Sequence, residues 1–325
     1  MSSSSSRSLD AVGIAGAILC CALWGGNAVA VKFAVGDIPP LACAGFRFLI
    51  GLPVVGLICL RSRQPLWVAP SLVWLVLVHA LFAVAQIGTF NVGTNLSLAG
   101  RASVLINIHP LVVAPLAALF LHERLGPRGW IGLISAALGV GLLLGSNYFA
   151  QGGVVGPELL GDLIVFLSGA IFGVQTIVQK KTFPLIPPIT LLFTQSLVAI
   201  PIFLGLSVVF EGVSNYHPTR AAFWGLAYQG LAALGICYSL WLWLLRNYPA
   251  GRLATIAFLS PLFGLAFSRM FQGEPLTWPL LSAAAAVGLG IYLVASEKLP
   301  AANPVTPARP VSLPSDQTRP VLTEG

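Results

Sequence analysis

The residues Ile38-Pro39-Pro40 recur as Ile186-Pro187-Pro188, at an offset of 148 positions. Further residues match at the same or nearly the same offset in both directions along the chain. At 148 they are Trp24-Gly25 with Phe172-Gly173, Asn27 with Gln175, and Pro53 with Pro201; at 151 they are Ala99-Gly100-Arg101 with Ala250-Gly251-Arg252, Pro110 with Pro261, and Glu123 with Glu274. Because the matches keep their order, they indicate an internal duplication.

The composition excludes most classes of protein. Of the 325 residues, 57% are hydrophobic and 8% are charged, whereas soluble domains are about 45–50% apolar and about 25% charged. This excludes a soluble globular, a disordered or a nucleic-acid-binding protein. One transmembrane helix needs about 20 residues, so the chain has room for about ten, and none for a soluble catalytic domain.

The apolar stretches predict an all-α membrane protein, since a helix satisfies its own backbone hydrogen bonds in hydrocarbon. We expect a tail at 1–10, a first repeat at 11–147, a linker at 148–158, a second repeat at 159–296 and a disordered proline-rich tail at 297–325. The ten predicted transmembrane helices are 11–35, 39–60, 68–90, 100–121, 127–146, 159–180, 187–210, 221–245, 251–272 and 277–296.

Each repeat holds five helices, an odd number, so the second must enter the membrane from the opposite side. The predicted fold is therefore two inverted five-helix repeats, an arrangement used by alternating-access transporters. Twelve Lys and Arg residues fall on one side and four on the other, with Arg47 inside a helix. The positive-inside rule then predicts a multi-pass protein of the inner (plasma) membrane with both termini in the cytoplasm.

Three motifs resemble those of the drug/metabolite transporter superfamily, in particular its ten-helix EamA-type members. They are Ala22 to Lys32 (ALWGGNAVAVK), Gly45 to Phe48 (GFRF) and Leu121 to Leu125 (LHERL). The resemblance implies secondary transport, commonly export of amino acids or other small metabolites. The second repeat departs from the pattern at Gln195, which stands where the first has Arg47.

The leading hypothesis is therefore a secondary transporter that exports amino acids or similar small polar metabolites by alternating access. A membrane-embedded enzyme and a channel-like or sensor protein are the alternatives. The sequence holds no catalytic constellation, and its five cysteines lie in apolar runs without metal-ligand spacing. We expect no metal, no cofactor and no nucleic acid; the expected partners are the lipid bilayer and a small-molecule metabolite, and the sequence leaves a homodimer open.

Aromatic and polar residues in the predicted helices are the candidate substrate-binding residues, because a polar group in hydrocarbon needs a partner. That partner is either the substrate or a neighbouring helix, and the sequence leaves both open. Trp24 and Asn27 match Phe172 and Gln175 in the second repeat. The full candidate set is Trp24, Asn27, His79, Gln86, Asn107, Phe172, Gln175, Tyr228 and Trp241.

Two further pairs of residues carry expectations. Pro110 and Pro261 are predicted to break the fourth and ninth helices, and paired breaks are typical of transporter binding sites. Arg47 is a costly charge inside the membrane, and we expect a structural ion pair between it and Asp162. The alternative is that Arg47 binds an anionic group.

The remaining expectations concern helix ends and helix faces. Glu123 and Glu274, at the ends of the fourth and ninth helices, are expected to form ion pairs with loops. Small residues around Gly139 and Gly288 are expected to form a close-packed scaffold or a dimer contact.

Overall fold

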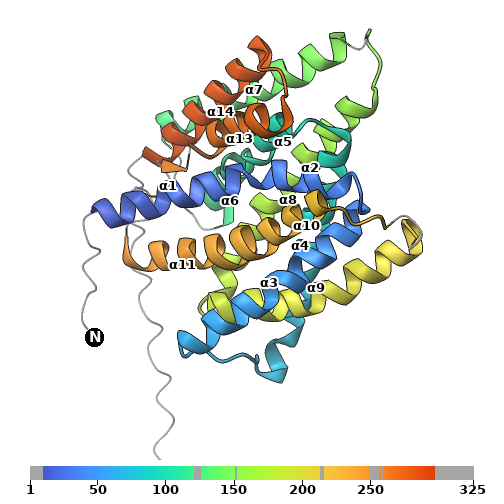
Figure 1. Cartoon of the computed structure of the whole chain (residues 1–325). Coiled ribbons are helices and arrows are strands. Elements are labelled where there is room, and N and C mark those ends of the chain that lie inside the picture. The colour runs from blue at the N-terminus through green and yellow to red at the C-terminus, as the bar shows by residue number, and fades with distance from the viewer. Residues whose placement is uncertain are drawn as a thin grey trace, which may run out of the picture.

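The computed structural model of the chain describes residues 10–120, 126–150, 152–212, 216–248, 253, 256–257 and 259–296, and Figure 1 shows its arrangement. Within this part of the chain, the regular elements are helices and there is no strand. The first half comprises α1 (Ala11–Gly25), α2 (Asn27–Val35), α3 (Pro40–Arg61), a 3-10 turn η1 (Pro70–Leu72), α4 (Val73–Leu96), α5 (Ala99–Ile106), α6 (His109–Phe120) and α7 (Pro127–Ala150).

The second half begins with α8 (Pro157–Thr182) and α9 (Pro188–Phe210). Its next span is composite: α10 (Arg220–Ala227), a π-helix η3 (Tyr228–Cys237) and α11 (Tyr238–Asn247). It ends with α13 (Leu259–Gln272) and α14 (Trp278–Ser296). Seven of the spans are long and apolar enough to cross a membrane by length and composition, and the shorter α5–α6, α13 and α14 complete the ten.

Proline fixes where several of the helices begin. Pro40 and Pro188, the last residues of the repeated Ile-Pro-Pro motif, are the first residues of α3 and α9. Pro127 and Pro157 likewise open α7 and α8. Proline suits this position because its φ is already helical and its missing N–H would have had no partner in the first turn. The motif that revealed the duplication therefore marks equivalent helix starts.

The helix packing shows the inverted two-fold relation. Three pairs join a helix to its own counterpart: α3 to α9, α5 to α13 and α7 to α14. Several other contacts occur twice with the halves exchanged; for example, α4 packs on α8, and the composite eighth span packs on α1 and α2. In Figure 1 the α3–α9 pair and the α7–α14 pair lie on opposite sides of the bundle. The fold is therefore the predicted one, ten helices in two inverted five-helix repeats.

Small residues allow α7 and α14 to touch backbone to backbone. A Cβ added at Gly132 would lie 2.7 Å from the carbonyl oxygen of Gly290, and one at Gly139 would lie 2.7 Å from the Cβ of Ala286. Close approach of this kind strengthens helix packing in lipid, where burial adds little. The small residues of α7 and α14 therefore pack against each other within one chain. The homodimer stays a prediction, and no surface is assigned to it.

Replacing Gly132 by alanine should lower the free energy of unfolding by about 1–3 kcal/mol, the usual cost of overpacking. The added methyl group meets backbone, which cannot rotate away. Gly141→Ala is the matched control on the same helix, because a Cβ there meets nothing within 4 Å. Thermal denaturation of both variants in detergent measures the difference. Equal melting temperatures for the two would contradict the close contact between α7 and α14.

Candidate functional site

The first membrane span is kinked at a pair of glycines. α1 ends at Gly25 and α2 begins at Asn27, while Gly26 keeps a right-handed backbone with φ −71° and ψ −13°. The Tyr228 hydroxyl donates a 2.8 Å hydrogen bond to the carbonyl oxygen of Leu23. A Cβ on Gly26 would lie 2.5 Å from that hydroxyl oxygen, so a larger residue would displace the tyrosine side chain from this hydrogen bond. The sequence analysis did not predict this kink, although the Gly25-Gly26 pair was its signal.

The repeat-related residues Trp24 and Phe172 each contact another aromatic ring, on helices that are not related by the repeat. Trp24 of the first span contacts Trp241 of the eighth, with ring centroids 5.3 Å apart and an edge-to-face geometry. In the other half, Phe172 of α8 lies 4.4 Å from His109 of α6, measured between ring centroids. All four side chains are half-buried. The structure therefore brings Trp24 and Trp241 together, and it places Phe172 beside a histidine that the candidate set omitted.

The break in the fourth span lies next to Pro110. α5 ends at Ile106 and α6 begins at His109. The side-chain amide of Asn107 donates to the Ser103 carbonyl at 2.7 Å, and Nδ1 of His109 donates to the Ile106 carbonyl at 3.3 Å. These side chains satisfy carbonyl groups that the broken helix leaves free.

In the ninth span, α13 begins at Leu259, so Pro261 lies in its first turn, equivalent to the place of Pro110 in α6. Residues 254, 255 and 258, just before it, lie outside the described part. The two prolines thus occupy matching positions at the start of a helix.

The polar residues of the third span contact the sixth. Nε2 of His79 lies 2.9 Å from the Thr182 hydroxyl. Gln86 donates to the Ser168 hydroxyl at 3.1 Å, and Ser168 donates back to the Gln86 carbonyl at 2.7 Å. Both contacts are hydrogen bonds between α4 and α8, which is one of the two roles left open for these residues. A role in substrate binding stays a prediction.

Asp162 is not the partner of Arg47, contrary to our expectation. Its carboxylate forms a 2.5 Å ion pair with Arg101 and accepts hydrogen bonds from Ser97 and, at 3.0 Å, from Asn147. The position of Asp162 among the helices is therefore not the one we expected. α8, which carries Asp162, packs against α4, α5 and α7, whereas α3 packs against α9 and η3.

Arg47 instead points toward the first span. Its Nη1 lies 3.5 Å from the side-chain oxygen of Asn27, a long hydrogen bond. The guanidinium is buried, with 7% of the residue exposed. Arg47 and Asn27 are thus brought together by α3 and α2, while Gln175, the counterpart of Asn27, is buried without a hydrogen-bond partner among the described residues.

Glu274 does not form the expected loop ion pair either. Its carboxylate accepts hydrogen bonds from the backbone N–H groups of Ala99, at 2.7 Å, and Gly100, at 2.8 Å. It therefore caps the N-terminus of α5, whose first N–H groups have no partner within the helix. Glu211 does the same for α3, accepting from Leu41 at 2.8 Å and Ala42 at 3.2 Å. Glu123, the counterpart of Glu274, lies outside the described residues.

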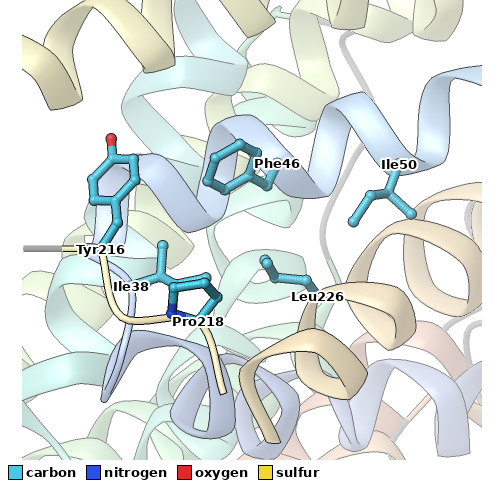
Figure 2. Close-up of a pocket in the computed structure, with 6 residues that line it drawn as sticks. All are labelled: Ile38, Phe46, Ile50, Tyr216, Pro218 and Leu226. Atoms are coloured by element: carbon cyan, nitrogen blue, oxygen red, sulfur yellow. The ribbon is translucent and has the colours of Figure 1, made fainter. Parts of the chain in front are cut away.

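A cavity of about 240 Å³ lies between the 216–218 segment, α3 and α10 (Figure 2). It is lined by Ile38, Phe46, Ile50, Tyr216, Pro218 and Leu226. The Tyr216 hydroxyl is already hydrogen-bonded to Ser207 at 2.7 Å. None of the candidate substrate-binding residues lines this cavity, and its apolar wall offers no group that would recognise a polar metabolite.

Two inverted five-helix repeats with matching proline positions define a membrane transporter fold. The chain belongs to the EamA-like transporter family, whose model matches residues 11–145 and again 159–296. It is therefore a multi-pass membrane protein of a transporter family.

The curated relatives span nearly the whole chain. An uncharacterised transporter of Bacillus subtilis, YoaV, is 25% identical over 279 residues, which cover 86% of this chain and 94% of that protein. A Salmonella typhimurium protein named "Probable amino-acid metabolite efflux pump" is 27% identical and covers 85% of this chain and 92% of its own. A protein of the same name from Escherichia coli is 26% identical, with the same coverage. A crystal structure with 19% identity and a TM-score of 0.65 covers 87% of this chain and 96% of its own, and shares the fold.

The assignment of Asp162 to Arg101 can be tested by double-mutant cycles. Asp162→Asn should destabilise the folded protein by about 3–5 kcal/mol, because it leaves the Arg101 cation without its anion. Combined with Arg101→Gln, the loss should be clearly less than additive, whereas combined with Arg47→Gln it should be additive. Thermal denaturation of the purified variants measures both couplings. A coupling of Asp162 to Arg47 rather than to Arg101 would restore the original expectation.

Proposed function

We propose that this chain exports amino acids or similar small polar metabolites by alternating access across the inner (plasma) membrane, with both termini in the cytoplasm. Membership of a transporter family supports transport itself. Two relatives whose names describe amino-acid metabolite efflux support the substrate class and the direction. The inverted repeats support alternating access, because exchanging the conformations of two related halves opens a central site to either side.

The observation that carries the proposal is the pair of aromatic contacts, Trp24–Trp241 and His109–Phe172. Each lies beside a helix interruption and within about one turn of a side-chain amide, Asn27 in one half and Gln175 in the other. An aromatic face and an amide together suit a molecule with an apolar part and hydrogen-bonding groups. The amide of Gln175 is free to bind such a molecule, since it has no partner among the described residues.

The alternatives, a membrane-embedded enzyme or a channel-like or sensor protein, differ from a carrier in kinetics. A carrier saturates and exchanges internal for external substrate, while an open pore conducts down the gradient without exchange. An enzyme would convert the substrate. Transport of labelled amino acids by proteoliposomes, with and without a pH gradient, separates the three.

Trp24→Ala and Phe172→Ala should each reduce amino-acid efflux from proteoliposomes about tenfold. Loss of an aromatic contact and of its buried area costs more than about 1.4 kcal/mol of binding free energy, which corresponds to a tenfold change in affinity. Trp278→Ala is the matched control, because Trp278 is 84% exposed and lies at the start of α14. Equal transport by all three variants would show that the aromatic pairs do not contribute to substrate binding.

The orientation can be tested by labelling single cysteines in intact spheroplasts. The five native cysteines are buried, so they give little background. Val154→Cys, in the exposed segment between α7 and α8, should react with an impermeant maleimide, and Ser62→Cys, at the end of α3, should react only after lysis. Labelling in the reverse order would place both termini outside the cell.

A further inference from the structure

Arg47 is a buried cation without an anion. Its Nε has no hydrogen-bond partner among the described residues, and its Nη1 makes only the long contact to Asn27. The one ion pair formed within the described part of the chain joins Arg101 to Asp162. A charge such as that of Arg47 is strongly destabilising in hydrocarbon unless an anion joins it.

A second incomplete group is Gln229, whose neighbour in the chain, Gly230, packs against the backbone of Arg47. Gln229 is fully buried; its amide donates to the Ala30 carbonyl at 3.3 Å, and its Oε1 has no partner among the described residues. The backbones of α3 and η3 touch here, since a Cβ on Gly230 would lie 2.9 Å from the Arg47 carbonyl oxygen. Ala30 is one helical turn from Asn27 on α2. Arg47, Asn27 and Gln229 therefore approach one region from three helices.

The three residues also lie at one depth. On the predicted outer side of the membrane, α2 ends, and α3 and α10 begin. Counted from these outer ends, Arg47 is seven residues into α3, Asn27 is eight residues into α2 and Gln229 is nine residues beyond the start of α10. At 1.5 Å per residue these distances are roughly 10, 12 and 14 Å. The midplane of the hydrocarbon is about 15 Å from either surface. The group is therefore close to the centre of the membrane, where transporters hold their substrates.

We propose that Arg47 binds the carboxylate of the transported amino acid, and that the side-chain oxygens of Asn27 and Gln229 accept hydrogen bonds from its ammonium group. This inference rests on the proposed function and names the groups of the substrate that the chain recognises. An arginine supplies parallel N–H donors that match a carboxylate. A carbonyl oxygen has two lone pairs, so Asn27 can accept from both Arg47 and the ammonium group.

Two features of the sequence and structure agree with this site. Gln229 lies in the π-helix η3, and π-helical segments are rare and frequent at functional sites. In the second repeat, Gln195 occupies the position of Arg47 and its Oε1 also has no partner among the described residues. One half thus supplies a cation and the other a neutral amide, so the chain holds one carboxylate site rather than two.

The test compares acids with their carboxamides. L-leucine, L-phenylalanine and L-glutamine, each paired with its carboxamide, are titrated into the purified full chain, and binding is followed by the rise in melting temperature. At least one acid should stabilise the wild-type protein at a concentration at least tenfold lower than its carboxamide. In Arg47→Gln that preference should disappear, and in Arg47→Lys it should persist in weaker form, since lysine keeps the charge without the paired donors.

Gln195→Ala, at the equivalent position of the other repeat, is the matched control and should keep the preference for the acid. Equal binding of acid and carboxamide to the wild-type protein would overturn the inference and leave amino-acid transport intact. An unchanged preference in Arg47→Gln would also overturn it. Failure of every acid and every carboxamide to bind would overturn the proposed substrate class, and the inference with it. If Arg47→Gln does not fold, the Arg47→Lys variant provides the test. A preference for the acid as strong as that of the wild-type protein would then overturn the site with paired donors.

Discussion

Every carbonyl group in the membrane needs a hydrogen-bond donor, and the chain meets this need with side chains at the interruptions of its first and fourth spans. At the kink in the first span, the Leu23 carbonyl accepts from Tyr228; at the break in the fourth, the Ser103 carbonyl accepts from Asn107. Polar residues that look available in the sequence are therefore partly used by the backbone. Fewer side chains, such as Arg47 and Gln229, keep a donor or acceptor without a partner, and these are the better candidates for substrate binding.

The sequence was sufficient to predict the fold because hydrocarbon leaves so few choices. Apolar runs predicted the helices, and the repeated motifs together with the odd number of helices in each repeat predicted the inverted halves. The interruption at Gly26 was missed because glycine is common in membrane helices. The contact with Tyr228, which depends on the tertiary structure, is what distinguishes this glycine from the others. The π-helix η3 likewise has no clear pattern in the residues that form it.

The candidate site was harder to predict, because depth in the membrane can be read from a sequence and lateral position cannot. α8 and α3 have different neighbours, so the Asp162 carboxylate pairs with Arg101 rather than with Arg47. The same limitation applied to Glu274. Its position at a helix end was evident, but its partner, the N-terminus of α5, comes from the other half of the chain.

The ion pair between Arg101 and Asp162 also bears on the evolutionary history of the protein. Arg101 belongs to the first repeat and Asp162 to the second, and the residue that matches Asp162 at the repeat offset of 148 is the apolar Ile14. Two copies of the first repeat alone would therefore contain two Arg101 side chains without this carboxylate. The ion pair is thus a contact that the first half makes only with a partner that differs from itself.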